Sequence, residues 1–146
     1  MKTKAAFWDT SAIVPLCCVQ YNSFAARQQA RVHQPFFVWW ATRLEPLNIC
    51  SRLLREKNLT TKGFDQARHR LETLALSWIE INRDAHLRGI TEHILTQHAL
   101  STADGLQLAA ALVWCRGYPR HRAFVRADIQ LSKAAEKVGF DVQLIQ

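Results

Sequence analysis

Short apolar runs alternate with helical patterns along the whole chain. Five segments have the composition of strands: 5–8, 36–39, 78–81, 123–125 and 140–144. Three of these segments are continuous apolar runs, which is typical of strands buried on both faces of a parallel sheet. Segments with helical spacing stand between them, without an internal repeat or a low-complexity linker. The alternation predicts an α/β fold with a mainly parallel central sheet.

The chain length and composition indicate a single domain spanning residues 1–146. A chain of 146 residues with 49% hydrophobic residues can bury a core without disulfides or a structural metal. The four cysteines have no metal-site spacing and are expected to be reduced; they are Cys17, Cys18, Cys50 and Cys115.

Hydropathy gives no indication of a membrane protein. The longest apolar run, 108–115, is too short to span a bilayer, which requires about twenty residues. Lys2 and Lys4 resemble the start of a signal peptide, but Asp9 interrupts the apolar run that follows. We therefore expect a cytoplasmic protein without membrane association.

The charge balance indicates an anionic partner. The formal net charge is +7 and the isoelectric point is about 9.7, values that fit nucleic acid, an acidic protein or a membrane surface. Six arginines are candidate phosphate contacts: Arg52, Arg55, Arg116, Arg120, Arg122 and Arg126. Ordinary solvated surfaces are the competing explanation for most of them.

Four acidic residues stand where a strand gives way to a helix or where a helix begins. Asp9 follows strand 5–8, and Asp128 follows strand 123–125. Glu45 and Asp104 lie in the first turns of predicted helices. Open α/β sheets bind ligands at the carboxyl ends of their strands, beside helix N-termini, so these acids form a candidate site.

The two acids that follow strands also have local explanations. Asp9 fits a turn before a helix that Thr10 or Ser11 is expected to cap. Asp128 fits the N-cap of the helix that begins at about Ile129. Taken singly, neither position requires a functional role.

The other two acids have the spacing of capping boxes. Glu45 follows Thr42 by three residues, and Asp104 follows Ser101 by three residues. An acid in the first turn also interacts favourably with the helix dipole. Capping and a common site therefore both remain open for each acid.

Four motifs occur around these acids, in a fixed order. They are Phe7-Trp8-Asp9-Thr10-Ser11-Ala12, Leu44-Glu45, Thr102-Ala103-Asp104-Gly105-Leu106-Gln107-Leu108-Ala109-Ala110 and Phe124-Val125-Arg126-Ala127-Asp128. In this order they resemble the motifs of PIN-domain ribonucleases of the VapC toxin type. The resemblance covers nearly the whole chain, and the series of four acids is specific although each motif alone is weak.

The resemblance implies a PIN-like (Rossmann-like) three-layer α/β/α fold and a metal-dependent endoribonuclease. The acidic active site would hold Mg²⁺ or Mn²⁺, with Asp9, Asp104 and Asp128 as ligands. Glu45 would be a ligand through water or would orient the nucleophile. Two carboxylates about 4 Å apart repel by roughly 4 kcal/mol at an effective dielectric near 20, and a divalent cation reverses the sign of that energy. Mg²⁺ keeps several waters and can align one for attack on a phosphodiester.

Three further residues bear on this site. Ser11 and Thr102 are candidate hydrogen-bond donors to the carboxylates, and simple capping explains them equally well. Arg126 stands where many relatives carry threonine or serine, two residues before the last acid. This departure affects the surroundings of the acids and leaves all four in place.

Two other functional classes are compatible with parts of the pattern. A haloacid-dehalogenase-like phosphatase also begins with a strand that ends in a nucleophilic aspartate, but it needs a second acid where Ser11 stands. A catalytically silent PIN-fold module that binds RNA or protein would keep the fold and the positive surface without turnover. Intact acids argue against the silent module.

The resemblance also implies the partners. The substrate would be RNA, the natural inhibitor would be a small VapB-like antitoxin that covers the active-site groove, and the domain would form a homodimer.

Overall fold

The structure, a computed structural model, describes residues 2–146 and contains helices and strands in alternation. In chain order the elements are β1 (Ala6–Trp8), α1 (Thr10–Cys17), α2 (Ser23–Val32), β2 (Phe36–Trp39), the 3-10 helix η1 (Trp40–Arg43), α3 (Leu44–Arg55), α4 (Thr61–Ser77), β3 (Ile79–Ile81), α5 (Ala85–Gln97), α6 (Thr102–Trp114), β4 (Ala123–Arg126), α7 (Ile129–Val138) and β5 (Asp141–Leu144).

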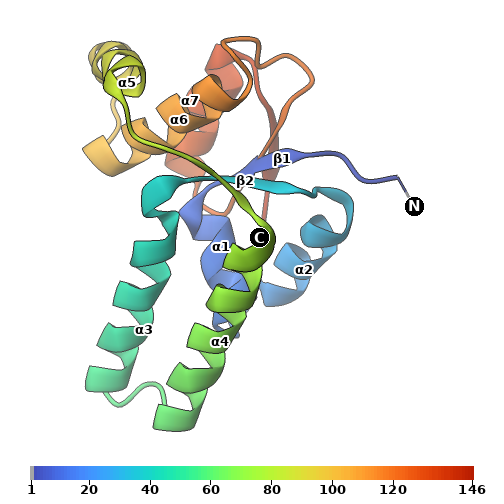
Figure 1. The fold of residues 1–146 in the computed structure, drawn as a ribbon, viewed down its shortest axis with the longest axis vertical. Helices are drawn as coiled ribbons and strands as arrows, with labels where there is room; N and C mark the ends of the chain where they lie inside the picture. The colour runs from blue at the N-terminus through green and yellow to red at the C-terminus, as the bar shows by residue number, and fades with distance from the viewer. Residues whose placement is uncertain (1) are drawn as a thin grey trace.

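The described residues form one five-stranded sheet with the strand order β3-β2-β1-β4-β5. Every pair of neighbouring strands is parallel. Figure 1 shows α5, α6 and α7 on one face of the sheet and α1, α2, α3 and α4 on the other. The predicted three-layer α/β/α fold is therefore confirmed. Because the strands are all parallel, their carboxyl ends lie at a single edge of the sheet.

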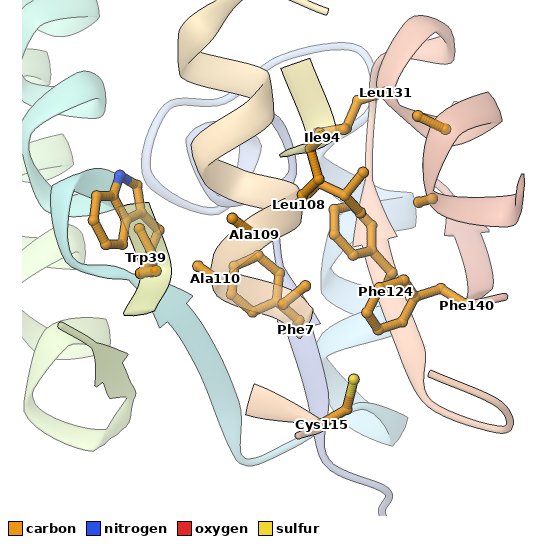
Figure 2. Close-up of a cluster of buried hydrophobic side chains, with 14 residues drawn as sticks. Phe7, Trp39, Ile94, Leu108, Ala109, Ala110, Cys115, Phe124, Leu131 and Phe140 are labelled. Carbon is orange, nitrogen blue, oxygen red and sulfur yellow. The ribbon is translucent and has the colours of Figure 1, made fainter. Parts of the chain in front are cut away.

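Each face of the sheet carries its own hydrophobic core. Successive side chains of a strand point to opposite faces, so Phe7 of β1 packs with Phe124 of β4 and Leu108 of α6, as Figure 2 shows. Trp8, one residue later, packs with Ile13 in the core on the other face. The central strands are therefore buried on both faces, as their continuous apolar sequences predict.

Small residues let α6 lie close against the sheet and against α5. Ala109 and Ala110 are completely buried beside Phe7 and Leu108 (Figure 2). A Cβ atom on Gly105 would lie 2.7 Å from Leu95 of α5, closer than real contacts allow. The helix α6 is thus packed against both the sheet and α5, and Gly105, the residue after Asp104, takes part in the contact with α5.

Two local predictions were wrong. Asp9, rather than Thr10 or Ser11, caps α1, because its carboxylate accepts a hydrogen bond from the Ser11 amide at 3.0 Å. Thr42 does not form a capping box with Glu45, because η1 intervenes before α3 and Thr42 uses its hydroxyl for buried contacts described below.

Two remaining properties concern the whole of residues 2–146. None of the helices there combines the length and the apolar character needed to cross a membrane. The four cysteines are buried and unbridged.

Candidate active site

The four acidic residues lie along the carboxyl edge of the sheet. Asp9 follows β1 directly, and Asp128 stands two residues after β4, the strand next to β1. Asp104 lies in the first turn of α6, and Glu45 lies in the first turn of α3. Helix N-termini at this edge carry partial positive charge, which favours the ionised form of nearby carboxylates.

All four acidic side chains line one pocket of about 310 Å³. Its wall also includes Ser11, Asn22, Gln107 and Arg126. A larger pocket of about 570 Å³, largely apolar and lined by residues such as Trp39 and Leu106, lies beside α5 and α6. We place the candidate site in the smaller of the two pockets, because the four acids line that pocket and not the larger one.

Asp9 is the most firmly held of the four. Its side chain accepts hydrogen bonds from both the amide and the hydroxyl of Ser11, and the residue is only 3% exposed. The same Ser11 hydroxyl accepts a hydrogen bond from the Ala127 amide at 2.9 Å. Ser11 therefore links the acid that follows β1 to the segment that follows β4.

The capping alternative has a different outcome for the other acids. Asp128 caps α7, since its carboxylate accepts a hydrogen bond from the Gln130 amide at 3.0 Å. Asp104 does not cap α6: its amide donates to the hydroxyl of Ser101, which is the N-cap residue. The Asp104 carboxylate lines the pocket instead.

Two of the acids show the electrostatic effect of crowding. Partial burial raises the pKa of Glu45, and the negative charges of Asp9 and Asp104 raise it further. Burial likewise raises the pKa of Asp104, and repulsion from Asp9 adds to this effect, while Arg126 acts in the opposite direction. The acids therefore interact with one another across the pocket.

A buried hydrogen-bond network stands behind the acids, and no sequence pattern predicted it. The Thr10 hydroxyl donates to the Thr42 hydroxyl at 3.0 Å, and the Gln107 amide donates to Thr10 at 2.7 Å and to Thr42 at 3.4 Å. These residues come from α1, η1 and α6, the elements that adjoin Asp9, Glu45 and Asp104.

Gln107 is the member of this network that a sequence signal could have revealed. It is a polar residue within an apolar helix, three residues after Asp104, so both side chains lie on the same helix face. Its carbonyl oxygen Oε1 is buried in the pocket wall and has no hydrogen-bond partner among residues 2–146. This oxygen is free to accept a hydrogen bond from a bound water or ligand.

Arg126 brings positive charge into the acidic pocket. Its NH1 lies 3.6 Å from Asp9 Oδ2, and its NH2 lies 3.4 Å from Asp128 Oδ2. The side chain is 1% exposed, so this arginine is part of the buried wall and is not a surface contact for phosphate.

The chemistry of the pocket can be compared with the needs of a divalent cation. Anywhere in residues 2–146, no three acidic, histidine or cysteine side chains converge closely enough to hold a metal ion. The kind of ligand nevertheless fits Mg²⁺ or Mn²⁺, because hard carboxylate oxygens line one pocket and repel each other there. The carboxylates are therefore suitable ligands for such a cation by chemical type, and in this structure Arg126 balances part of their negative charge.

Several predicted residues lie away from the acids. Thr102 lines the larger pocket rather than the acidic one, because a separation of two residues places it about 200° around α6 from Asp104. The exposed Arg52 and Arg55 lie on α3, where Arg52 pairs with Glu56 at 3.8 Å.

Three of the candidate arginines lie at the opposite edge of the sheet. Arg116, Arg120 and Arg122 are exposed in the loop that precedes β4. Since Ala123 pairs with Ala6, this loop adjoins the amino ends of the strands, whereas the acids follow the carboxyl ends. The structure therefore does not bring these arginines to the acidic pocket.

Comparison with solved structures shows a shared fold. One chain from a toxin-antitoxin complex of Klebsiella pneumoniae superposes with a TM-score of 0.63 at 13% sequence identity, covering 86% of this chain and 88% of that chain. A chain in the crystal structure of FitAcB from Neisseria gonorrhoeae superposes with a TM-score of 0.64 at 18% identity, covering 97% and 96%. The fold of the present chain thus matches the PIN-like three-layer arrangement expected from its motifs.

No family model matches the sequence, and no curated protein matches it. At identities of 13% and 18% the structural likeness shows the fold alone.

Proposed function

We propose that this chain is a metal-dependent endoribonuclease and the toxin of a toxin-antitoxin pair. The observation that carries the proposal is that Asp9, Glu45, Asp104 and Asp128 all line one pocket at the carboxyl edge of a parallel sheet. The fold shared with a chain of a toxin-antitoxin complex supports the same conclusion.

In this proposal the acids divide the work by position. Asp9, Asp104 and Asp128 would hold Mg²⁺ or Mn²⁺, and Glu45 at the exposed rim would hold and orient the attacking water. A bound divalent cation supplies positive charge that activates water and stabilises the charge developing on the phosphodiester. Ser11 keeps Asp9 oriented through two hydrogen bonds.

The remaining assignments of the proposal concern partners. The formal charge of +7 would attract RNA over long range. A small antitoxin that covers the acidic pocket would act as inhibitor, and the domain would form a homodimer.

A second function is favoured by one specific observation. Arg126 already pairs with Asp9 and Asp128, and three acids do not converge closely within residues 2–146. This arrangement fits a PIN-fold module that binds RNA or protein without cleaving it.

Cleavage of end-labelled RNA distinguishes the two functions. The purified protein is incubated with RNA in EDTA, MgCl₂ or MnCl₂, and Asp9→Asn is compared with Asp65→Asn, which changes an exposed acid of α4. Asparagine keeps the oxygen that caps α1 but removes one of the two charges beside the buried Arg126, so we expect Asp9→Asn to fold with lower stability than the parent. Mutation of a residue that only hydrogen-bonds to a metal ligand lowers metal affinity or activity by about 10- to 100-fold. Loss of Asp9, a proposed ligand itself, should therefore lower the cleavage rate by about a hundredfold or more.

The controls separate site chemistry from contamination. Asp65→Asn should cleave at the parent's rate, and EDTA should abolish cleavage. Metal-independent cleavage, or equal rates for Asp9→Asn and the parent, would reject the proposed site. Tight RNA binding without cleavage in any metal would select the silent module.

A further inference from the structure

Arg126 is a buried arginine in the wall of an acidic pocket. It ends β4, and backbone pairing of that strand with β1 on one side and β5 on the other fixes its position. The side chain is 1% exposed, whereas arginine is almost never fully buried without paired charges. Its surroundings therefore have to supply compensating negative charge.

The compensation comes from two acids at the ends of neighbouring strands. NH1 lies 3.6 Å from Asp9, and NH2 lies 3.4 Å from Asp128. Both distances exceed the roughly 2.7–2.9 Å of a charge-assisted hydrogen bond. The guanidinium is thus held between the two carboxylates by charge rather than by bidentate hydrogen bonding.

Two nitrogens of the same guanidinium lack a hydrogen-bond partner among residues 2–146. They are Nε and NH1 of Arg126, both buried, and the residue lines the pocket together with the unpaired Gln107 Oε1. A buried cationic group with unmade hydrogen bonds is only partly stabilised. The arrangement is therefore one from which the guanidinium can be displaced when another cation binds.

The guanidinium lies beside two of the carboxylates that the proposed function assigns to a cation. A divalent cation held by Asp9 and Asp128 would need the carboxylate charge that Arg126 now neutralises. Two positive charges beside the same carboxylates also repel each other. Binding of one must weaken the contacts of the other.

We propose that Arg126 is an internal counter-ion that competes with a divalent cation for Asp9 and Asp128. The inference rests on the cation site of the proposed function and adds a determinant of its affinity. Arg126 stabilises the metal-free protein and raises the cation concentration needed to fill the site. Removal of the arginine should lower the stability of the metal-free protein and should also lower the cation concentration needed to fill the site.

The test measures Mn²⁺ binding by Arg126→Ser without reference to activity. Titration calorimetry with MnCl₂ and thermal melting in EDTA and in MnCl₂ are carried out on parent and variant. In EDTA the variant should melt below the parent, because Asp9 and Asp128 lose their counter-charge. In MnCl₂ the variant should bind about tenfold more tightly, which adds about 3–6 °C to the metal-induced rise in melting temperature.

Two further variants keep the test decisive. Arg126→Met removes the charge but retains the buried stem, so it should fold even if the serine variant does not, and it should change both quantities in the same directions. Arg120→Ser removes the same formal charge from the exposed loop on the far edge of the sheet and should match the parent in both.

The outcomes separate this inference from the proposed function. Equal Mn²⁺ affinity in parent, Arg126→Ser and Arg126→Met would overturn the competition, even if the parent cleaves RNA. Tighter binding by the Arg126 variants with no RNA cleavage by any protein would uphold the competition and reject the nuclease. Absence of Mn²⁺ binding in all variants would overturn the competition as well.

Discussion

Replacement of Asp104 by asparagine should stabilise the metal-free protein and weaken its response to metal. The Asp104 carboxylate does not cap α6, because the Ser101 hydroxyl takes that role. An asparagine side chain would nearly preserve the shape of the residue while removing its charge. The variant therefore removes the repulsion that the Asp104 charge causes within the acidic pocket.

The size of the effect follows from three opposing terms. Loss of the dipole interaction costs about 0.3–1 kcal/mol. Relief of the repulsion from Asp9 contributes on the order of 1 kcal/mol, because solvent screens the charge of a half-buried group. Loss of the attraction to Arg126 offsets part of this gain.

The raised pKa of Asp104 decides the sign of the balance. Burial and Asp9 raise that pKa despite Arg126, so folding disfavours the charged carboxylate relative to the unfolded chain. We expect a net gain of about 1 kcal/mol, or about 2–4 °C for a domain of this size. In metal at a hundred times Kd the parent should gain about 2.7 kcal/mol, or about 5–11 °C, and Asp104→Asn should lose most of that gain.

The assay is thermal melting of parent, Asp104→Asn and Asp65→Asn in EDTA, MgCl₂ and MnCl₂. Asp65 is an exposed acid beyond the first turn of α4, so its replacement tests the loss of a surface carboxylate away from the pocket. Equal metal-induced shifts in the parent and Asp104→Asn, or a lower melting temperature of Asp104→Asn in EDTA, would refute the argument that Asp104 belongs to a repelling cluster.

Two further predictions concern the surroundings of the acids. Thr42→Val keeps the shape of a completely buried side chain but removes its bonds to Thr10 and Gln107, so urea unfolding should show a loss of about 1–3 kcal/mol; a loss below about 0.5 kcal/mol would contradict the role of the network. The pKa values of Glu45 and Asp104 are higher in the folded protein than in the unfolded chain. Between the ordinary and the raised pKa values the folded protein therefore binds more protons than the unfolded chain does. As the pH rises through this interval, which begins at about 4, the free energy of unfolding should fall. In EDTA the stability of the parent minus that of a Glu45→Gln, Asp104→Asn double variant should therefore fall as pH rises there; a rise would show the opposite sign of the shift.

Local patterns predicted the fold because they depend on residues only a few positions apart. Continuous apolar runs predicted strands buried on both faces, and the intervening helical spacing predicted the crossovers of a parallel sheet. The same topology places residues that follow strands at one edge, and the pocket indeed collects Asp9, Glu45, Asp104 and Asp128. Their roles in catalysis and metal binding remain predictions.

Topology could also have placed the basic loop, although composition alone did not. Arg116, Arg120 and Arg122 precede β4, and residues that precede a parallel strand lie at the edge opposite to its carboxyl end. Their positive charge attracts anions in general, but charge carries no information on which edge it occupies.

Sequence patterns did not predict which residue caps the start of a helix. Asp9 and Thr10 are both acceptable cap residues for α1 by type, yet Asp9 caps the helix and the Thr10 hydroxyl bonds to Thr42. Which of two suitable residues caps a helix depends on the alternative partners that tertiary packing offers each side chain.

Only the tertiary structure decided which distant residues share the pocket. Gln107 bonds to Thr10 across 97 positions of sequence, and Arg126 reaches Asp9 because β1 and β4 are neighbours in the sheet. Such contacts depend on strand order and register, which bring distant segments together, whereas sequence periodicity records only which face of its own element a residue occupies. The sequence by itself therefore determined the elements and the edge at which the acids stand, and the packing of the strands determined that a buried arginine lies between two of them.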